Sequence, residues 1–227
     1  MGLQGIRIIA FFGADGVGKS TQVQLLIKRL QQLGQKCRKA WIRSPHGFAF
    51  YAWRLLIRIG YKRALTNRFG YRLELPIVDR DPLMKRIWPW FELINIIPIF
   101  LAKVKIPLML GYTIIAERLL VDSIATIAHF IYDTRFPQST VARLLLSLTP
   151  QDTLFIHLTC DYKTLMARRR NLVEPYDSSI FQMRIFDELA NHLNALTINT
   201  AHTTPQQTHK IIWSYLQPIM GRCNAPR

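Results

Sequence analysis

The chain has 227 residues, of which 49% are hydrophobic and 19% are charged, and its net charge is +16. This composition is typical of a globular protein and excludes a disordered or fibrous chain, and the length suits a single α/β domain. The three cysteines lie far apart without CxxC spacing and no secretion signal is visible, so we expect neither disulfides nor a zinc site, in a cytoplasmic protein.

The first sixty residues alternate between short β-rich runs and segments with helical spacing. We predict strands at 6–12 and 37–43 and helices at 19–33 and 48–58, with Gly34 in the position after the first helix. The first strand has no polar gap, which is typical of a strand buried on both faces.

The most apolar stretch of the chain is Ile87 to Leu110. Three charged residues and three prolines interrupt it, whereas a spanning helix needs about 20 apolar residues with few charges. We therefore predict a helix buried inside the domain and kinked at Pro98, rather than a membrane span.

The second half of the chain continues the alternation of strands and helices. We predict strands at 113–117, 153–158 and 196–200, and helices at 122–132, 139–148, 163–170, 178–196 and 205–216. Thr204 and Gln207 have the spacing of a capping box at the start of the last helix. Strands that alternate with helices indicate a parallel sheet of about five strands covered by helices on both faces. We therefore predict one three-layer α/β domain over residues 1–227.

A glycine-rich loop follows the first predicted strand and matches the pattern GxxxxGK[ST] in full. Its glycines allow successive backbone N–H groups to point at phosphate oxygens, and the helix that follows directs its N-terminus at the same anion. The pattern predicts a P-loop NTPase fold that binds ATP and Mg²⁺, with Lys19 at the β- and γ-phosphates and Ser20 as a magnesium ligand. The residues of this nucleotide-binding loop are Gly13, Ala14, Asp15, Gly16, Val17, Gly18, Lys19, Ser20 and Thr21.

A carboxylate and a guanidinium end the third predicted strand of the sheet, at Glu117 and Arg118. The carboxyl edge of an open parallel sheet is where ligands bind. Glu117 there is suited to hold Mg²⁺ or to take a proton from an acceptor hydroxyl, and Arg118 to stabilise phosphates during transfer. The absence of an NKxD tetrapeptide excludes an ordinary GTPase.

Four segments together resemble the thymidylate kinase family. The phosphate loop resembles the family's FEGxDGxGKST element. Arg43 to Gly47 is similar to the family's REPGG element. Glu117-Arg118 with Asp122-Ser123 is similar to its DRY…DS element. Residues 154–170 resemble the strand and arginine-rich helix before the family's lid.

The resemblance implies a nucleoside monophosphate kinase with dTMP as the acceptor, a short lid at about 168–178 and a homodimer formed through apolar helices. Asp15 would bind the 3′-hydroxyl of the acceptor. Arg43, Arg118 and Ser123 would form the acceptor site, with Glu117 in the position of the family's aspartate. The lid cations over the transferred group would be Arg168, Arg169 and Arg170.

The sequence departs from the family pattern mainly around the acceptor. Ser44 replaces a glutamate, Leu119 replaces an aromatic residue, and no counterpart of the family's helical arginine is found between Trp88 and Lys105. A deoxynucleoside kinase that phosphorylates a 5′-hydroxyl therefore remains an alternative, with Glu117 as the base.

The segment from Gly16 to Tyr71 contains no acidic residue but many lysines and arginines. Positive charge of this density favours polyanionic partners, and aromatics alternate with cations between Trp53 and Arg63. A third hypothesis is therefore an ATP-binding protein without catalysis that attaches to a membrane or to nucleic acid. We favour an ordinary helix whose cations coat the entrance to the acceptor site. The histidines show no paired spacing, and His157 is predicted to pack in the core.

Overall fold

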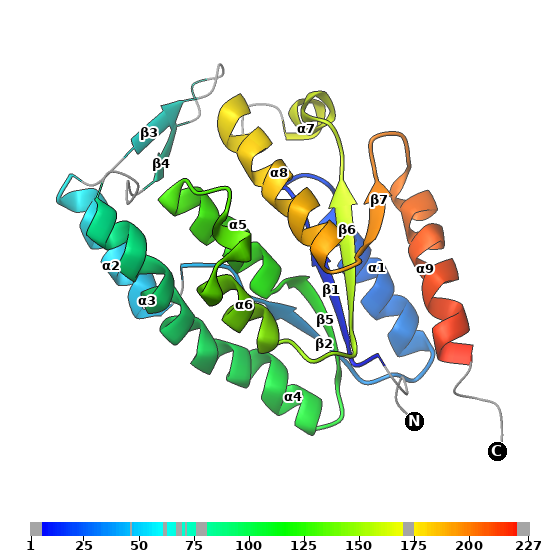
Figure 1. Ribbon diagram of the computed structural model, residues 1–227. Helices are drawn as coiled ribbons and strands as arrows, with labels where there is room; N and C mark the ends of the chain where they lie inside the picture. The colour runs from blue at the N-terminus through cyan, green and yellow to red at the C-terminus, as the bar shows by residue number, and fades with distance from the viewer. Residues whose placement is uncertain are drawn as a thin grey trace.

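The computed structural model describes residues 6–45, 47–60, 63–66, 70, 72–75, 81–169 and 175–221. Its centre is a five-stranded parallel sheet with the strand order β2-β5-β1-β6-β7 (Figure 1). The strands are β1 (Ile8–Phe12), β2 (Cys37–Trp41), β5 (Thr113–Arg118), β6 (Thr153–Thr159) and β7 (Leu196–Asn199). The predicted sheet of five parallel strands is confirmed.

Helices cover both faces of this sheet, which gives three layers (Figure 1). Successive side chains of β1 point to opposite faces, so that Ile8 and Phe12 pack in one core and Ile9 and Phe11 in the other. One core lies against α1 (Lys19–Gln32), α7 (Tyr162–Arg169) and α9 (Pro205–Gly221). The other lies against α2 (Phe48–Arg58), α3 (Pro82–Phe100), α5 (Leu120–Ile131), α6 (Thr140–Ser147) and α8 (Tyr176–His192).

A small antiparallel hairpin, β3 (Arg63–Thr66) and β4 (Arg72–Leu75), follows α2 and was not expected from the sequence. The strands have four residues each, and no Asn-Gly or Asp-Gly pair marks a two-residue turn between them. The other short element, the 3-10 helix Phe136–Gln138, lies between α5 and α6.

The apolar stretch after residue 80 forms one long helical segment. Asp81 caps α3 by accepting hydrogen bonds from the backbone N–H groups of Leu83 and Met84 at 2.9 and 3.2 Å. After Phe100 the helix changes to a π-helical turn, Leu101–Lys105, and then to α4 (Ile106–Met109). Among the described residues, no helix is long and apolar enough to cross a membrane.

The prediction of a fully buried helix here is wrong for one of its two faces. Glu92 and Ile96 are completely buried, but Ile94 is 66% exposed. The helix also continues through Pro98, and its winding changes only at Leu101. The helix lies at the margin of the molecule (Figure 1), where α2, α5 and α6 contact it and leave part of its surface uncovered.

Two local predictions are confirmed. Thr204 and Gln207 form the predicted capping box at the start of α9, with reciprocal hydrogen bonds of 2.8 and 3.2 Å between the backbone N–H of each and the side chain of the other. His157 is buried in the core and stacks on Phe12, with 4.9 Å between the ring centroids.

Candidate active site

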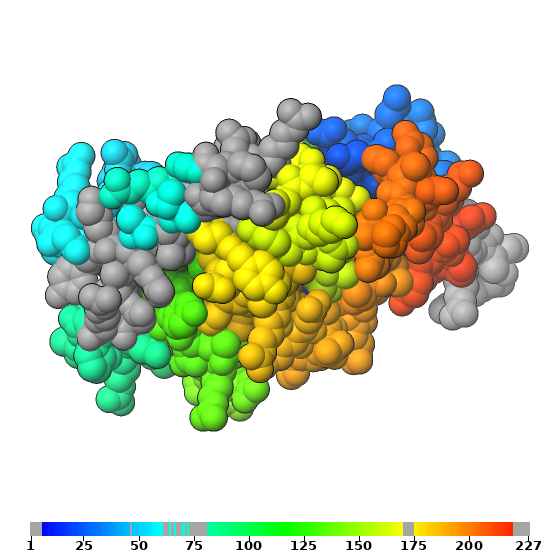
Figure 2. Space-filling view, turned by 90° about the horizontal axis from the view of Figure 1, so that it is seen from above, coloured from blue at the N-terminus to red at the C-terminus, as the bar shows by residue number. Residues whose placement is uncertain are grey.

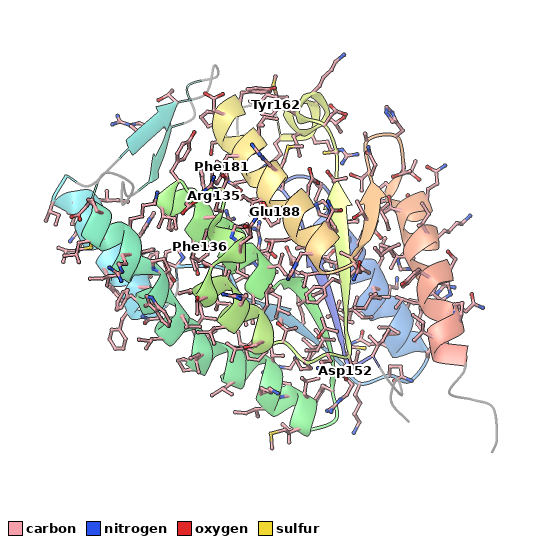
Figure 3. All side chains as sticks on the ribbon, in the orientation of Figure 1. Arg135, Phe136, Asp152, Tyr162, Phe181 and Glu188 are labelled. Carbon is pink, nitrogen blue, oxygen red and sulfur yellow. The ribbon has the colours of Figure 1, made fainter. Side chains whose placement is uncertain are left out.

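The carboxyl ends of β1, β2 and β5 lie beside one another and bring the phosphate loop, Arg43 and Glu117-Arg118 to the same edge of the sheet. Figure 3 locates this edge on the neighbouring strand β6. Asp152 lies just before β6 at the lower end of the sheet and Tyr162 lies shortly after it at the upper end, so the carboxyl edge is the upper one. Sequence-distant charged groups therefore meet at the position where open parallel sheets bind ligands.

The backbone of the phosphate loop lies close against β6. Gly13 has a φ of +134°, and a Cβ atom at this position would lie 2.1 Å from the carbonyl oxygen of Leu158. Only glycine fits there. The loop leads into α1, whose first residue is Lys19, so the free N–H groups of the helix N-terminus face the space enclosed by the loop.

Lys19 is 5% exposed and lies against the loop that precedes it. Its ammonium group donates hydrogen bonds to the carbonyl oxygens of Gly13 and Ala14 at 2.5 and 2.8 Å. Burial and the nearby Arg118 lower the pKa of Lys19 to about 8, although Asp15 opposes this shift. Burial disfavours the charged form of Lys19, and a bound phosphate would favour it by placing negative charge beside the ammonium group.

Asp15 is surrounded by four cations. Its carboxylate forms an ion pair with Arg118, and it lies 3.5 Å from Lys19, 3.2 Å from Arg43 and 3.7 Å from Arg169. Burial would raise the pKa of Asp15, but Lys19, Arg118 and Arg43 hold it well below its usual range. One carboxylate among four cations leaves an excess of positive charge, which suits a polyphosphate.

The loop and helix that follow β5 place Asp122 and Ser123 beneath Arg118. Asp122 is almost fully buried, 3.5 Å from the Arg118 guanidinium, and burial raises its pKa to about 6 against the opposing effect of Arg118. Ser123 is fully buried, and its hydroxyl has no hydrogen-bond partner within the described part of the chain.

Arg43 reaches the site from the end of β2, as predicted. Besides the contact with Asp15, its Nε atom donates to the hydroxyl of Thr126 on α5 at 3.4 Å. Thr126 in turn donates to the backbone carbonyl of Asp122 at 2.8 Å. Sequence reasoning did not find Thr126, because a threonine inside an apolar helix carries no signal of its own. His46, in the same predicted element as Arg43, lies outside the described residues.

Ser20 and Glu117 form the oxygen-rich part of the site. The Ser20 hydroxyl donates a hydrogen bond to one oxygen of the Glu117 carboxylate, and Lys39 forms an ion pair with the other. Burial opposes ionisation, but the hydrogen bonds from Lys39 and Ser20 lower the pKa of Glu117. Mg²⁺ prefers such oxygen ligands, and in sites of this kind it needs only one or two of them from the protein. These two residues therefore fit the predicted magnesium site.

A cavity of about 270 Å³ lies beside the phosphate loop. The guanidinium of Arg168 borders it and donates to both the hydroxyl and the carbonyl oxygen of Thr200, at 2.9 Å for the hydroxyl. Thr200 also donates to the carbonyl of Val17 at 3.1 Å, which ties the end of β7 to the loop. The remaining lining residues are Gly16, Gly18, Thr21, Gln22, Thr203, Pro205 and Thr208.

The two described arginines of the predicted lid thus face different parts of the site. Arg169 extends over the phosphate loop, where its side chain approaches Gly16 and Asp15, whereas Arg168 is held at the cavity. A role of either residue over the transferred group stays a prediction. Arg170 and the middle of the predicted lid, residues 170–174, lie outside the described residues.

No protein-family model and no curated protein sequence matches the chain. Solved structures do match it over nearly its whole length. Thymidylate kinase from Candida albicans superposes with a TM-score of 0.57 at 20% identity, covering 94% of this chain and 92% of that one. Thymidylate kinase from Ehrlichia chaffeensis gives a TM-score of 0.55 at 17% identity, covering 94% and 100%.

The chain has the thymidylate kinase fold. The sheet of five parallel strands, the phosphate loop after β1 and the helices on both faces agree with the fold that the order of elements and the loop pattern predicted. At the carboxyl edge of the sheet, charged side chains of this chain are clustered around Asp15 and Glu117.

Proposed function

We propose that the protein is a nucleoside monophosphate kinase that transfers the γ-phosphoryl group of ATP to a (deoxy)nucleoside monophosphate, with dTMP as the first acceptor to test. The observation that carries this proposal is the group of four cations around Asp15. Transfer between two phosphate-bearing substrates brings negative charge from both sides to one place, and three arginines and a lysine are suited to neutralise it.

Each residue has a separate part in this proposal. Lys19 and the backbone of the phosphate loop bind the terminal phosphates of the donor. Arg43 and Arg118 bind the acceptor phosphate, and Asp15 orients their guanidinium groups before any ligand arrives. Pre-oriented donors need no rearrangement when charge develops in the transition state. The cavity beside Arg168 accommodates the base of the donor nucleotide.

Ser20 and Glu117 would hold Mg²⁺ on the donor side. When bound, the ion would neutralise part of the charge of the donor phosphates. Glu117 accepts from Ser20 and Lys39, so its two oxygens are engaged at the metal position. This arrangement favours a monophosphate acceptor over a nucleoside acceptor, because the latter needs a carboxylate that is free to take a proton from a 5′-hydroxyl.

A panel of acceptors tests the proposal. We expect Mg²⁺-dependent formation of ADP from ATP with at least one nucleoside monophosphate, measured in a coupled assay, and no turnover by Lys19→Ala. The panel includes ribo- and deoxynucleoside monophosphates and the matching nucleosides. Turnover with nucleosides alone would establish the alternative of a deoxynucleoside kinase. Turnover with none of them, or no better than that of Lys19→Ala, would leave an ATP-binding protein without catalysis.

We also propose that two copies of the chain pair through the exposed face of α3. The exposed apolar side chains of this helix repeat with alternating spacings of four and three residues, which is the pattern of a helix–helix seam. They are Leu83, Ile87, Trp90, Ile94, Ile97 and Leu101, and each is between 37% and 66% exposed. These six side chains include no charged residue, so we expect another helix of the same kind to pack against them.

Ile94→Glu is therefore expected to convert a dimer into a monomer, because it places a charge in the centre of the seam. Sedimentation equilibrium of the purified protein measures the change. Ile211→Glu is the matched control, since Ile211 is an exposed isoleucine on α9. A wild-type chain that is monomeric at all concentrations, or an Ile94→Glu variant that dimerises as well as Ile211→Glu, would contradict the pairing.

A further inference from the structure

Helix α2 exposes a second apolar stripe, separate from the seam on α3. Phe48, Tyr51, Leu55 and Ile59 follow one another at intervals of three and four residues, and they are 80%, 70%, 58% and 60% exposed. The side of the helix that faces the protein carries Ala49 and Leu56, which are both buried, Leu56 within the core. The helix thus has apolar side chains on both its buried and its exposed face, which a purely structural helix does not need.

Positive charge accompanies this exposed stripe. Arg54 and Arg58 are exposed on the same helix, and the guanidinium of Arg54 lies 5.8 Å from the centre of the Phe50 ring. No acidic residue occurs between Gly16 and Tyr71, so nothing on α2 itself neutralises these cations. Figure 2 shows α2 (cyan) at one end of the molecule, with α9 (red) at the opposite end.

We propose that α2 docks on an anionic lipid surface, with the exposed stripe inserted among the lipid headgroups and Arg54 and Arg58 beside their phosphates. This combination of aromatic and aliphatic side chains with flanking arginines is that of a helix lying in the plane of a membrane interface. Docking of α2 on a membrane does not depend on which acceptor the protein phosphorylates.

Charge decides between this partner and a second copy of the chain. Two α2 helices facing each other would bring four arginines together without an acidic residue on either helix to pair with them. An anionic bilayer supplies the opposite charge at about 1 kcal/mol for each arginine near its surface. Nucleic acid would also supply it, and Phe48 and Tyr51 can stack on bases, but Leu55 and Ile59 cannot, whereas all four side chains suit the headgroup and acyl boundary.

Docking through α2 would also orient the site relative to the bilayer. Helix α2 begins at Phe48, shortly after Arg43, which lies in the cation cluster around Asp15. A bilayer bound to α2 would therefore lie on the acceptor side of the site rather than on the side of the cavity at Arg168, α7 and α9 (Figure 1).

Cosedimentation of the full chain with vesicles tests the proposal. We expect binding to phosphatidylcholine vesicles that contain phosphatidylserine, much weaker binding to phosphatidylcholine alone, and a decrease with salt. Arg54→Gln combined with Arg58→Gln should weaken binding about 25-fold, and Leu55→Glu should weaken it about tenfold or more. The matched control is Leu144→Glu, because Leu144 is an exposed leucine on α6 and its loss should leave vesicle binding unchanged.

The competing outcomes are distinct. Absence of binding to the phosphatidylserine vesicles, or equal binding by Leu55→Glu and Leu144→Glu, would overturn the proposal. Tight binding to single-stranded DNA that Leu55→Glu leaves intact would assign the basic surface to nucleic acid instead. Self-association that Leu55→Glu abolishes, without any vesicle binding, would assign the stripe to a second copy. Circular dichroism of each variant checks that it is folded.

Discussion

Arg118→Lys is expected to lower the rate of phosphoryl transfer about a hundred- to a thousandfold, which is the usual effect of losing one well-oriented donor in a transition state. Arg118 contacts the Asp15 carboxylate through one terminal nitrogen and lies 3.5 Å from Asp122 through the other. A lysine keeps the positive charge but has a single ammonium group in place of the planar fork, so it cannot hold both carboxylates and a phosphate together. The measurement is kcat in the coupled assay of ADP formation, with the best acceptor of the panel.

Arg135→Lys is the matched control for this variant. Arg135 is an exposed arginine in the turn after α5 (Figure 3) and does not belong to the group of cations around Asp15, so its replacement should leave kcat unchanged. Thermal unfolding of both variants separates a catalytic effect from a loss of stability, since Asp122 is almost fully buried and needs a nearby cation. A kcat for Arg118→Lys within about threefold of the wild type would show that Arg118 does not stabilise the transition state.

The strands and the core of the site were predictable from the sequence because they depend on local patterns. A strand buried between two layers of helices is a short continuous apolar run, and Ile8 to Phe12 is one. The phosphate loop is specified by its own residues, and the rule that parallel strands end at one edge brings Glu117 and Arg118 to it. Arg43, Arg118 and Arg169 meet at Asp15 for the same reason.

The contacts of Lys39 were not predictable, because they depend on strand register. Arg38 and Lys39 look equivalent in the sequence, and both belong to β2. Lys39 pairs with Ile115 of β5, so Glu117, two residues further along β5, lies on the same face of the sheet and is within reach of Lys39. This register is set between two strands that are far apart in the chain, and no residue in β2 signals it.

The environment of α3 was mispredicted for a related reason. A helix with apolar residues on every side is typical of a buried helix, and the sequence of α3 meets that description. Periodicity cannot tell whether a neighbour covers each face. Here α2, α5 and α6 contact the helix, and apolar side chains on the rest of its surface stay exposed.

Glu92→Gln is expected to stabilise the protein at alkaline pH and to flatten the dependence of its stability on pH. Glu92 is completely buried on α3, and neither of its carboxyl oxygens has a hydrogen-bond partner within the described part of the chain. Burial raises its pKa from 4.5 to about 8. A glutamine has the same shape and cannot ionise.

The sign follows from the protons bound in each state. At neutral pH the folded protein holds a proton on Glu92, whereas the unfolded chain, with the ordinary pKa, has lost it. The free energy of unfolding therefore falls as pH rises from about 4.5 to about 8, by about 1.4 kcal/mol per pH unit from this residue alone. The full stabilising contribution is present below the lower value and is lost above the upper one.

Urea unfolding of the wild type and of Glu92→Gln at pH 5, 7 and 8.5 measures the difference. The variant should gain stability over the wild type steadily with pH, by roughly 3 kcal/mol or more between the extremes. Asp122, whose pKa is also raised, titrates in both proteins, so its contribution cancels in the comparison. Glu188→Gln is the control, because Glu188 is a partly exposed glutamate on α8 (Figure 3), and it should show no such trend. A constant difference between wild type and Glu92→Gln across this range would mean that Glu92 is already ionised in the folded protein, with a cation or water inside the helix layer to balance it.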